Sequence, residues 1–155
     1  MELTSILRPE AVRIVSNSSS KKRLFQALCE AGCDAYGLCS KSAVEALQDR
    51  ENLGPTGVGK GIAIPHARLP ELGSVNGVFI RLEKPLEFSS VDRQPVDLIF
   101  ALFAPENSGV EHLKALALVS RTLRDPNICA KLRANTDAST LYTILTEAPV
   151  SSKAA

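Results

Sequence analysis

The stretch Val96-Asp97-Leu98-Ile99-Phe100-Ala101-Leu102-Phe103 is apolar at every position except Asp97. Alternate side chains of a β-strand point to opposite faces of its sheet, so a strand with this pattern has two apolar faces. Such strands are typical of the centre of a sheet that is covered on both sides. Strand-like and helix-like segments alternate on either side of this stretch, which predicts an α/β fold in a single domain.

Helical spacing of apolar residues predicts five helices around this strand. Two of them begin with the spacing of a capping box, a serine followed three residues later by glutamate: Ser42 with Glu45, and Ser108 with Glu111. The predicted helices comprise a short one at residues 3–7, one from the serines at 18–20 to Gly32, and others at about 40–54, 108–125 and 141–145.

Three further strands are predicted from short apolar runs at residues 11–15, 62–64 and 78–82. In the run 78–82 apolar residues alternate with others, which predicts a strand with two unlike faces. The connection 83–95 is long enough to reverse the chain between this strand and the central one. We therefore expect these two strands to be antiparallel, in a mixed sheet.

Composition excludes several classes of function. The chain has 155 residues, 45% of them hydrophobic, and a formal net charge of +1. This balance predicts no nucleic-acid partner, and no apolar run approaches the roughly 20 residues that span a bilayer. Four cysteines without a disulfide pattern or a Cys-x-x-Cys pair predict reduced thiols, no metal site and a cytoplasmic location. The four are Cys29, Cys33, Cys39 and Cys129.

A glycine-rich segment, Gly54-Pro-Thr-Gly-Val-Gly-Lys-Gly-Ile-Ala-Ile-Pro-His-Ala-Arg68, leads into the predicted strand at 62–64. It resembles a P-loop only in part, because Gly61 stands where the Mg²⁺-binding Ser or Thr would be, and because a helix precedes it and a strand follows. Glycines do let backbone amides approach an anion. The amides of Thr56, Gly57, Gly59 and Gly61 are therefore candidates for cradling a phosphate.

Three side chains are candidates for chemistry on that phosphate. His66 ends the segment, and neutral imidazole is a nucleophile near pH 7; the alternative is a histidine that only caps a strand end. His112 falls on the inward face at the start of its predicted helix, either facing an anion or as a buried core residue. Arg50 lies on the inward stripe of its helix, either as a fork for phosphate oxygens or as a cap for helix carbonyls. Together they indicate a phosphohistidine site.

These residues resemble a known family. The segment Arg50-Glu51-x-Leu53-Gly54-x-Thr56-Gly57-x-Gly59-x-Gly61-Ile62-Ala63-Ile64-Pro65-His66, with Pro95–Leu102 and His112-Leu113, is similar to the mannitol/fructose-type (type 2) enzyme IIA of the bacterial phosphotransferase system. The resemblance covers about residues 3–147, so we expect a phosphoacceptor domain at 1–147 and a flexible tail at 148–155. Ser20-Lys21-Lys22-Arg23 resembles the nitrogen regulatory branch.

The resemblance implies a mixed sheet of the five-stranded type with helices on both faces. It implies that His66 accepts a phosphoryl group on Nε2 from a histidine-containing phosphocarrier protein, with Arg50 and His112 lining the site and no metal or cofactor. The nitrogen branch implies a regulator that binds target proteins, such as transporters or sensor kinases, according to its phosphorylation. The alternative is a sugar-specific enzyme IIA that passes the phosphoryl group to a IIB domain for fructose or mannitol uptake. Neither reading assigns a role to Lys60 or Arg68.

Overall fold

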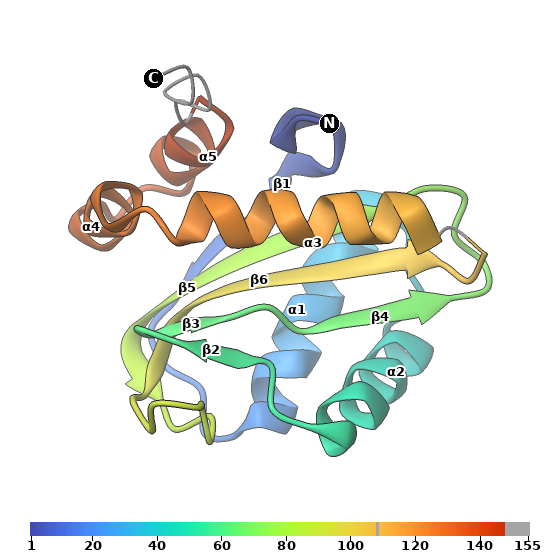
Figure 1. Cartoon of the computed structure of the whole chain (residues 1–155), viewed down its shortest axis with the longest axis horizontal. Helices are drawn as coiled ribbons and strands as arrows, with labels where there is room; N and C mark the ends of the chain where they lie inside the picture. The colour runs from blue at the N-terminus through green and yellow to red at the C-terminus, as the bar shows by residue number, and fades with distance from the viewer. Residues whose placement is uncertain (108, 148–155) are drawn as a thin grey trace.

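The computed structural model describes residues 1–107 and 109–147. They form one α/β domain in which helices cover both faces of a mixed sheet, as predicted (Figure 1). The predicted tail at 148–155 lies outside the described residues. No helix within the described part of the chain combines the length and the apolar character that crossing a membrane requires.

Six strands make up the sheet, in the order β1-β5-β6-β3-β2, with β4 also paired to β6. Ile62 pairs with Leu98 and His66 with Leu102, so β3 and β4 keep the same offset of 36 residues along β6. β3 and β4 therefore occupy one position in the sheet as a single interrupted strand. Counted in this way, the six strands agree with the expected five-stranded type. The strands are β1 (Leu7–Val15), β2 (Gly57–Gly59), β3 (Ile62–Ala63), β4 (His66–Leu69), β5 (Asn76–Leu86) and β6 (Val96–Pro105).

The predicted central strand is confirmed. From Leu98 to Ala104 every residue of β6 is at most 1% exposed, and β6 pairs with β5 on one side and with β3 and β4 on the other. β5 runs antiparallel to β6, as the long connection predicted. The two unlike faces predicted for residues 78–82 were wrong, because Val78, Phe79 and Ile80 are all fully buried. Helices cover both faces of the sheet to which β5 belongs, so the side chains on both faces of β5 at these positions are buried (Figure 1).

Most of the predicted helices are present, with changed boundaries. The hydroxyl of Ser20 caps the first long helix by accepting a bond from the Arg23 amide at 3.1 Å. That helix continues past Gly32, because the left-handed turn that ends it is at Gly37 (φ +77°). The helices are α1 (Lys21–Tyr36), α2 (Ser40–Leu53), α3 (Gly109–Leu123), α4 (Pro126–Ala134) and α5 (Ala138–Thr146), and a 3₁₀ turn η1 (Leu3–Ser5) precedes β1.

Two predictions about helix ends need correction or comment, and one helix was not predicted. The capping box of Ser42 with Glu45 was wrong: α2 begins at Ser40, and the Ser42 hydroxyl donates to the Cys39 carbonyl inside its first turn. The second box depends on Ser108, which lies outside the described residues. The unpredicted helix is α4, which has a proline at its first position and is capped by the Asp125 carboxylate, an acceptor from the Asn127 amide.

The packing of helices against the sheet brings the candidate residues Arg50, His66 and His112 close together. α3 crosses one face over β6, and α1 lies on the opposite face (Figure 1). α2 packs beside β4, the strand that begins with His66. The end of α2, the start of β4 and the start of α3 therefore lie close together, although they are far apart in the sequence.

Candidate functional site

His66 is held by the main chain of its own strand. It follows Pro65, whose carbonyl accepts a bond from the Leu102 amide of β6 at 2.9 Å. The His66 Nδ1 atom lies 2.9 Å from the Ile64 carbonyl oxygen. Because a carbonyl oxygen only accepts, Nδ1 carries the hydrogen and donates it. The Nε2 atom of the neutral ring consequently keeps its lone pair free for another partner.

Arg50 faces that lone pair from the last turn of α2. Its Nε donates to His66 Nε2 at 3.3 Å, and its Nη1 donates to the Gly54 carbonyl at 2.9 Å. Of the two interpretations that the sequence offered for this side chain, the cap at the helix end is present as the bond to Gly54. The role as a fork for phosphate oxygens stays a prediction. The carbonyl of Gly54 fixes the guanidinium, so its direction toward His66 does not depend on a flexible side chain alone.

His112 completes the group from the first turn of α3. Its side chain is 5% exposed, and its ring centroid lies 5.5 Å from that of His66, with the rings inclined by 71°. Its Nε2 atom is buried and has no hydrogen-bond partner among the described residues. A buried polar atom without a partner is costly, which suits a site that receives one from outside.

Both imidazoles are shifted toward the neutral form. Burial lowers the pKa of His66, and the nearby Arg50 charge lowers it further, against the opposing effects of the Ile64 hydrogen bond and of Glu51. Burial also lowers the pKa of His112 to about 4, with contributions from His66 and Arg68. The Arg50 charge disfavours protonation of His66, and the Arg68 charge disfavours protonation of His112. Both shifts therefore favour neutral rings.

The four residues expected to cradle an anion have other neighbours. Thr56 is 5% exposed, and its amide and hydroxyl both bind the Glu51 carboxylate. Gly57 packs against Ser90, and the other two glycines lie at the β2–β3 turn: Gly59 beside Asp92, and Gly61 beside Asp97 and Arg133. A phosphate-binding role for these residues stays a prediction that the observed contacts do not support.

Two charged residues near the histidines, Arg68 and Glu51, had no role predicted from the sequence. Arg68 follows His66 by two positions in β4, and residues two apart in a strand share a face. Its Nη1 donates to the Glu106 carbonyl at 3.4 Å, and its charge contributes to the low pKa of His112. Glu51, next to Arg50 in α2, accepts three bonds behind the site. The period of two in β4 is the signal that could have identified Arg68.

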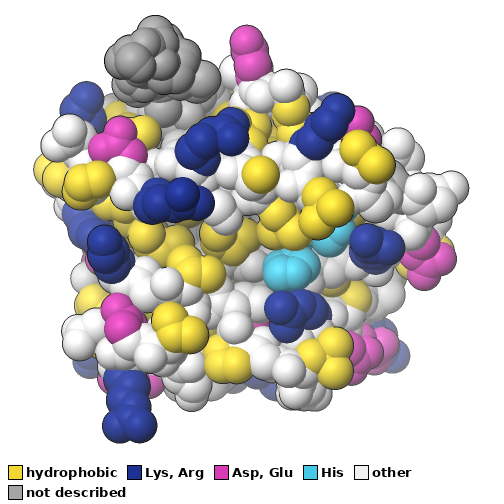
Figure 2. Space-filling model, in the orientation of Figure 1, with side chains coloured by type: hydrophobic (Ala, Val, Ile, Leu, Met, Phe, Trp, Pro, Cys, Tyr) yellow, Lys and Arg dark blue, Asp and Glu magenta, His cyan; other side chains and the backbone are white. Residues whose placement is uncertain are grey.

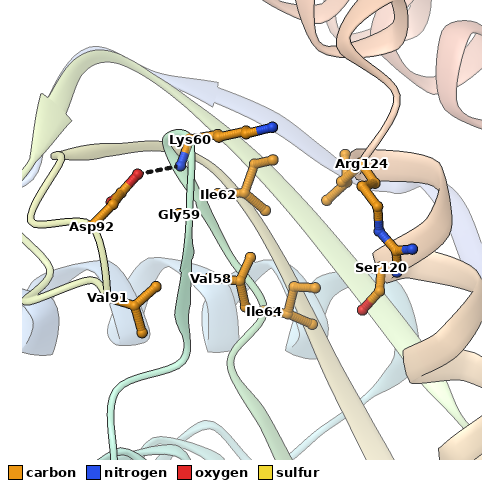
Figure 3. A pocket seen from close by; sticks show the side chains of 10 residues that line it. Val58, Gly59, Lys60, Ile62, Ile64, Val91, Asp92, Ser120 and Arg124 are labelled. Atoms are coloured by element: carbon orange, nitrogen blue, oxygen red, sulfur yellow. Dashed lines mark hydrogen bonds between the residues drawn. The ribbon is translucent and has the colours of Figure 1, made fainter.

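A groove of about 480 Å³ runs from the β2–β3 hairpin to the end of α3 (Figure 3). Its apolar floor includes Ile64, whose carbonyl orients His66. On its rim Val58 and Val91 are 54% and 77% exposed. In Figure 2 parts of both histidine side chains are visible between apolar and basic side chains. The groove is lined by Val58, Gly59, Lys60, Ile62, Ile64, Val91, Asp92, Ser120, Leu123 and Arg124.

Within residues 1–107 and 109–147, no three His, Cys, Asp or Glu side chains are grouped so that they could hold a metal ion. All four cysteines are free thiols: Cys29 and Cys129 are buried, and Cys33 and Cys39 are exposed.

Comparison with known proteins gives consistent matches over nearly the whole chain. Residues 5–148 match the family described as "Phosphoenolpyruvate-dependent sugar phosphotransferase system, EIIA 2". A nitrogen regulatory protein of Bradyrhizobium diazoefficiens is 45% identical over 149 residues, which are 96% of this chain and 97% of the relative.

Solved structures agree with this match. The nitrogen regulatory protein IIA-Ntr of Neisseria meningitidis superposes with a TM-score of 0.84 and 34% identity, covering 93% of this chain and 99% of that one. The IIA mannitol protein of Escherichia coli has the same fold, with a TM-score of 0.74 and 21% identity over 89% of this chain and 97% of that one.

Proposed function

Because the chain belongs to the EIIA 2 family of the phosphoenolpyruvate-dependent sugar phosphotransferase system, we propose that it carries a phosphoryl group on Nε2 of His66. The observation that supports this most directly is the fixed ring of His66. Its Nδ1 donates to the Ile64 carbonyl, and its Nε2 faces the Arg50 guanidinium. A nucleophilic nitrogen and a cation that attracts phosphate oxygens therefore lie side by side.

The proposed donor is a phosphohistidine on a small phosphocarrier protein. The lone pair of His66 Nε2 forms a bond to phosphorus while the bond from phosphorus to the donor ring nitrogen breaks. The electron pair of the broken bond returns to the donor imidazole. The Nδ1 hydrogen of His66 stays on its ring, bonded to Ile64, so His66 releases no proton during the step.

Arg50 and His112 stabilise the charge of the transferred group. Phosphoryl transfer depends mainly on positioning and on electrostatic stabilisation of the equatorial oxygens. The guanidinium of Arg50 supplies a permanent positive charge within bonding distance of His66. His112, whose Nε2 lacks a partner among the described residues, gains a hydrogen-bond partner when the phosphoryl group arrives. No metal ion enters this scheme, since phosphorus moves between two nitrogen atoms.

The groove beside His66 suits the approach of the carrier protein. The buried centre of an interface is more apolar than the rest of the surface. Val58 and Val91 offer apolar surface on this groove (Figure 3). Two basic residues, Lys60 and Arg124, and one acidic residue, Asp92, also line it. We assign the binding site of the carrier to this face because Ile64, which lines the groove, is two residues before the phosphoacceptor His66.

The biological output we propose is regulation, through target proteins that bind one phosphorylation state in preference to the other. A phosphoryl group adds nearly two negative charges at the histidines, which is enough to change the set of partners that a basic surface accepts. The names of the relatives in Bradyrhizobium and Neisseria, both nitrogen regulatory proteins, support this branch. Transfer to a sugar-specific IIB domain is the alternative, and the mannitol protein of the same fold is its model.

The decisive test is labelling with phosphoenolpyruvate, enzyme I and a phosphocarrier protein. We expect label that is lost in acid and kept in alkali, as a phosphorus–nitrogen bond requires, and no label in the His66→Ala variant. His112→Ala is the comparison: it removes the other histidine of the chain and leaves the acceptor in place, so it should still take label, at a reduced rate. Full labelling of His66→Ala contradicts the proposal.

A second assay separates the two branches. The phosphorylated protein is mixed with fructose- or mannitol-specific IIB domains and the sugar, and the loss of label is followed. A regulator keeps its label on the timescale on which a sugar-specific enzyme IIA loses it. Rapid transfer to sugar would replace the regulatory reading by the alternative.

A further inference from the structure

The carboxylate of Glu51 is buried behind the candidate site, and both of its oxygens accept hydrogen bonds. Its side chain is 7% exposed and pairs with Lys21 at 2.7 Å. It also accepts from the Thr56 amide at 3.1 Å and from the Thr56 hydroxyl at 2.6 Å. A buried carboxylate with three donors holds its partners firmly, because breaking any one of the bonds leaves a charge poorly solvated.

Thr56 passes this restraint to the segment that carries His66. Its carbonyl accepts a bond from the Ile64 amide at 3.0 Å. The carbonyl of Ile64 in turn accepts from His66 Nδ1 at 2.9 Å. A continuous series of hydrogen bonds therefore runs from Lys21 through Glu51, Thr56 and Ile64 to the imidazole.

The same carboxylate-bearing residue also restrains Arg50. The main-chain carbonyl of Glu51 accepts from the Gly54 amide at 3.1 Å, and the Gly54 carbonyl accepts from Arg50 Nη1 at 2.9 Å. The turn between Gly54 and Thr56 is thus attached at one end to the guanidinium and at the other to the Glu51 side chain. A shift of this turn would move the nucleophile and the cation together.

We infer that Glu51 and Thr56 are positioning residues for phosphoryl transfer, which hold the Ile64 carbonyl against Nδ1 and so keep the lone pair of His66 on Nε2. The inference rests on the proposed function for its meaning, since it concerns the readiness of His66 to accept a phosphoryl group. Neither residue touches the reacting nitrogen. Partners of this kind fix the tautomer and the direction of a reactive imidazole.

Two substitutions remove the restraint in different degrees. Thr56→Val deletes the hydroxyl and keeps the shape of the side chain. Glu51→Gln places an NH₂ group where one oxygen accepted, and this group cannot accept from Lys21 or Thr56. We expect both variants to transfer phosphate more slowly, with Glu51→Gln losing about 10- to 100-fold. Thr56→Ser, which keeps the hydroxyl, restores most of the rate.

The readout that a purely structural role would not change is the tautomer of His66. Ring ¹⁵N chemical shifts, measured above the pKa of His66, report which nitrogen carries the hydrogen. We expect the Nδ1–H form in the wild type and a mixture of both forms in Glu51→Gln and Thr56→Val. The matched control is Thr122→Val, which deletes another buried threonine hydroxyl, bonded to the Leu118 carbonyl at 2.9 Å within α3. It lowers stability and leaves the tautomer and the transfer rate unchanged.

The outcomes separate this inference from the function on which it rests. If folded Thr56→Val and Glu51→Gln keep either the wild-type tautomer or the wild-type rate, the positioning role is overturned. If the wild-type protein takes no label at His66, the proposed function fails instead. The tautomer measurement needs no phosphorylation, so the two failures cannot be confused.

Discussion

At the scale of single residues, the arrangement of three side chains explains why this histidine, rather than another, is a good phosphoacceptor candidate. His66 is fixed at both nitrogens, by a carbonyl on one side and by a guanidinium on the other. A nucleophile that is already oriented loses little conformational freedom when it reacts. His112 lies next to it as a neutral ring, because burial and neighbouring charges lower its pKa to about 4.

Removal of the Arg50 guanidinium tests the electrostatic part of the mechanism. Arg50→Ala is expected to slow transfer by about 100-fold, the usual cost of losing one stabilising donor at a developing charge. The fold should survive, since Arg50 caps only one carbonyl. Rates of carrier-dependent labelling measure the effect. Arg13→Ala is the control, as its guanidinium pairs with Asp34 at the exposed surface; an equal loss in both variants would show that the effect is not local.

The low pKa of His112 also predicts how stability depends on pH. Burial lowers the pKa of His112 in the folded protein to about 4, from the ordinary histidine value of 6.5. Between these values the unfolded chain binds more protons, so the free energy of unfolding falls as the pH falls from 6.5 towards 4. The full effect is about 3 kcal/mol. The lowered pKa of His66 acts in the same direction.

Urea unfolding at several pH values measures this slope. His112→Gln, which cannot take up a proton in this range, should reduce it, while stability above pH 7 shows the cost of the substitution itself. An identical slope in the wild type and in His112→Gln would mean that other groups are responsible for the acid sensitivity.

At the scale of elements, the β2–β3 hairpin shows why the glycine-rich segment is needed even where it binds no anion. Gly61 has φ +82°, a conformation that L-residues rarely adopt. A Cβ atom there would lie 2.9 Å from Asp97 Oδ1 and close to the Arg133 guanidinium. That guanidinium bonds both Asp97 and the Lys60 carbonyl at 2.9 Å, so it joins α4 to the hairpin.

Gly61→Ala is therefore expected to destabilise the protein by at least about 1–2 kcal/mol, the cost of a left-handed conformation for a residue with a side chain. Displacement of Arg133 would add to this cost. Chemical denaturation measures the loss. Gly73→Ala provides the comparison, since a Cβ atom at Gly73 would meet nothing within 4 Å. Equal stability of the two variants would contradict this account of the hairpin.

At the scale of the whole molecule, the groove beside His66 predicts how the carrier protein is recognised. Val91→Asp places a charge on an exposed apolar rim. We expect kcat/KM with the phosphocarrier to fall about 10-fold, a loss typical of a contributing interface residue. Phosphorylation by phosphoramidate, a small donor that needs no docking surface, should be unchanged.

The control adds the same charge elsewhere. Thr4 lies in the exposed N-terminal turn, away from the groove. Thr4→Asp should therefore leave the rates with the phosphocarrier and with phosphoramidate unchanged. If Val91→Asp slows the small donor as much as the carrier, the residue acts on the site itself and not on docking.

Features set by neighbouring residues could be predicted from the sequence alone. The apolar run of β6 predicted a strand covered on both faces, and the serine before α1 predicted its cap, because periodicity and capping depend on residues close together in the chain. Errors arose where a local pattern competed with packing. The alternation at 78–82 predicted two unlike faces, but helices pack on both faces of the sheet, and Val78, Phe79 and Ile80 are all buried.

The sequence by itself thus determined the α/β class, the central strand and the three residue types expected at a phosphohistidine site. Only the tertiary structure decided that they meet. His66 and His112 are 46 residues apart in the chain, and their rings lie 5.5 Å apart. This distance depends on the register of β4 against β6 and on the packing of α2 and α3. The tautomer of His66 depends likewise on the link from Glu51 through Thr56, because a hydrogen bond between distant segments exists only after the sheet and helices have assembled.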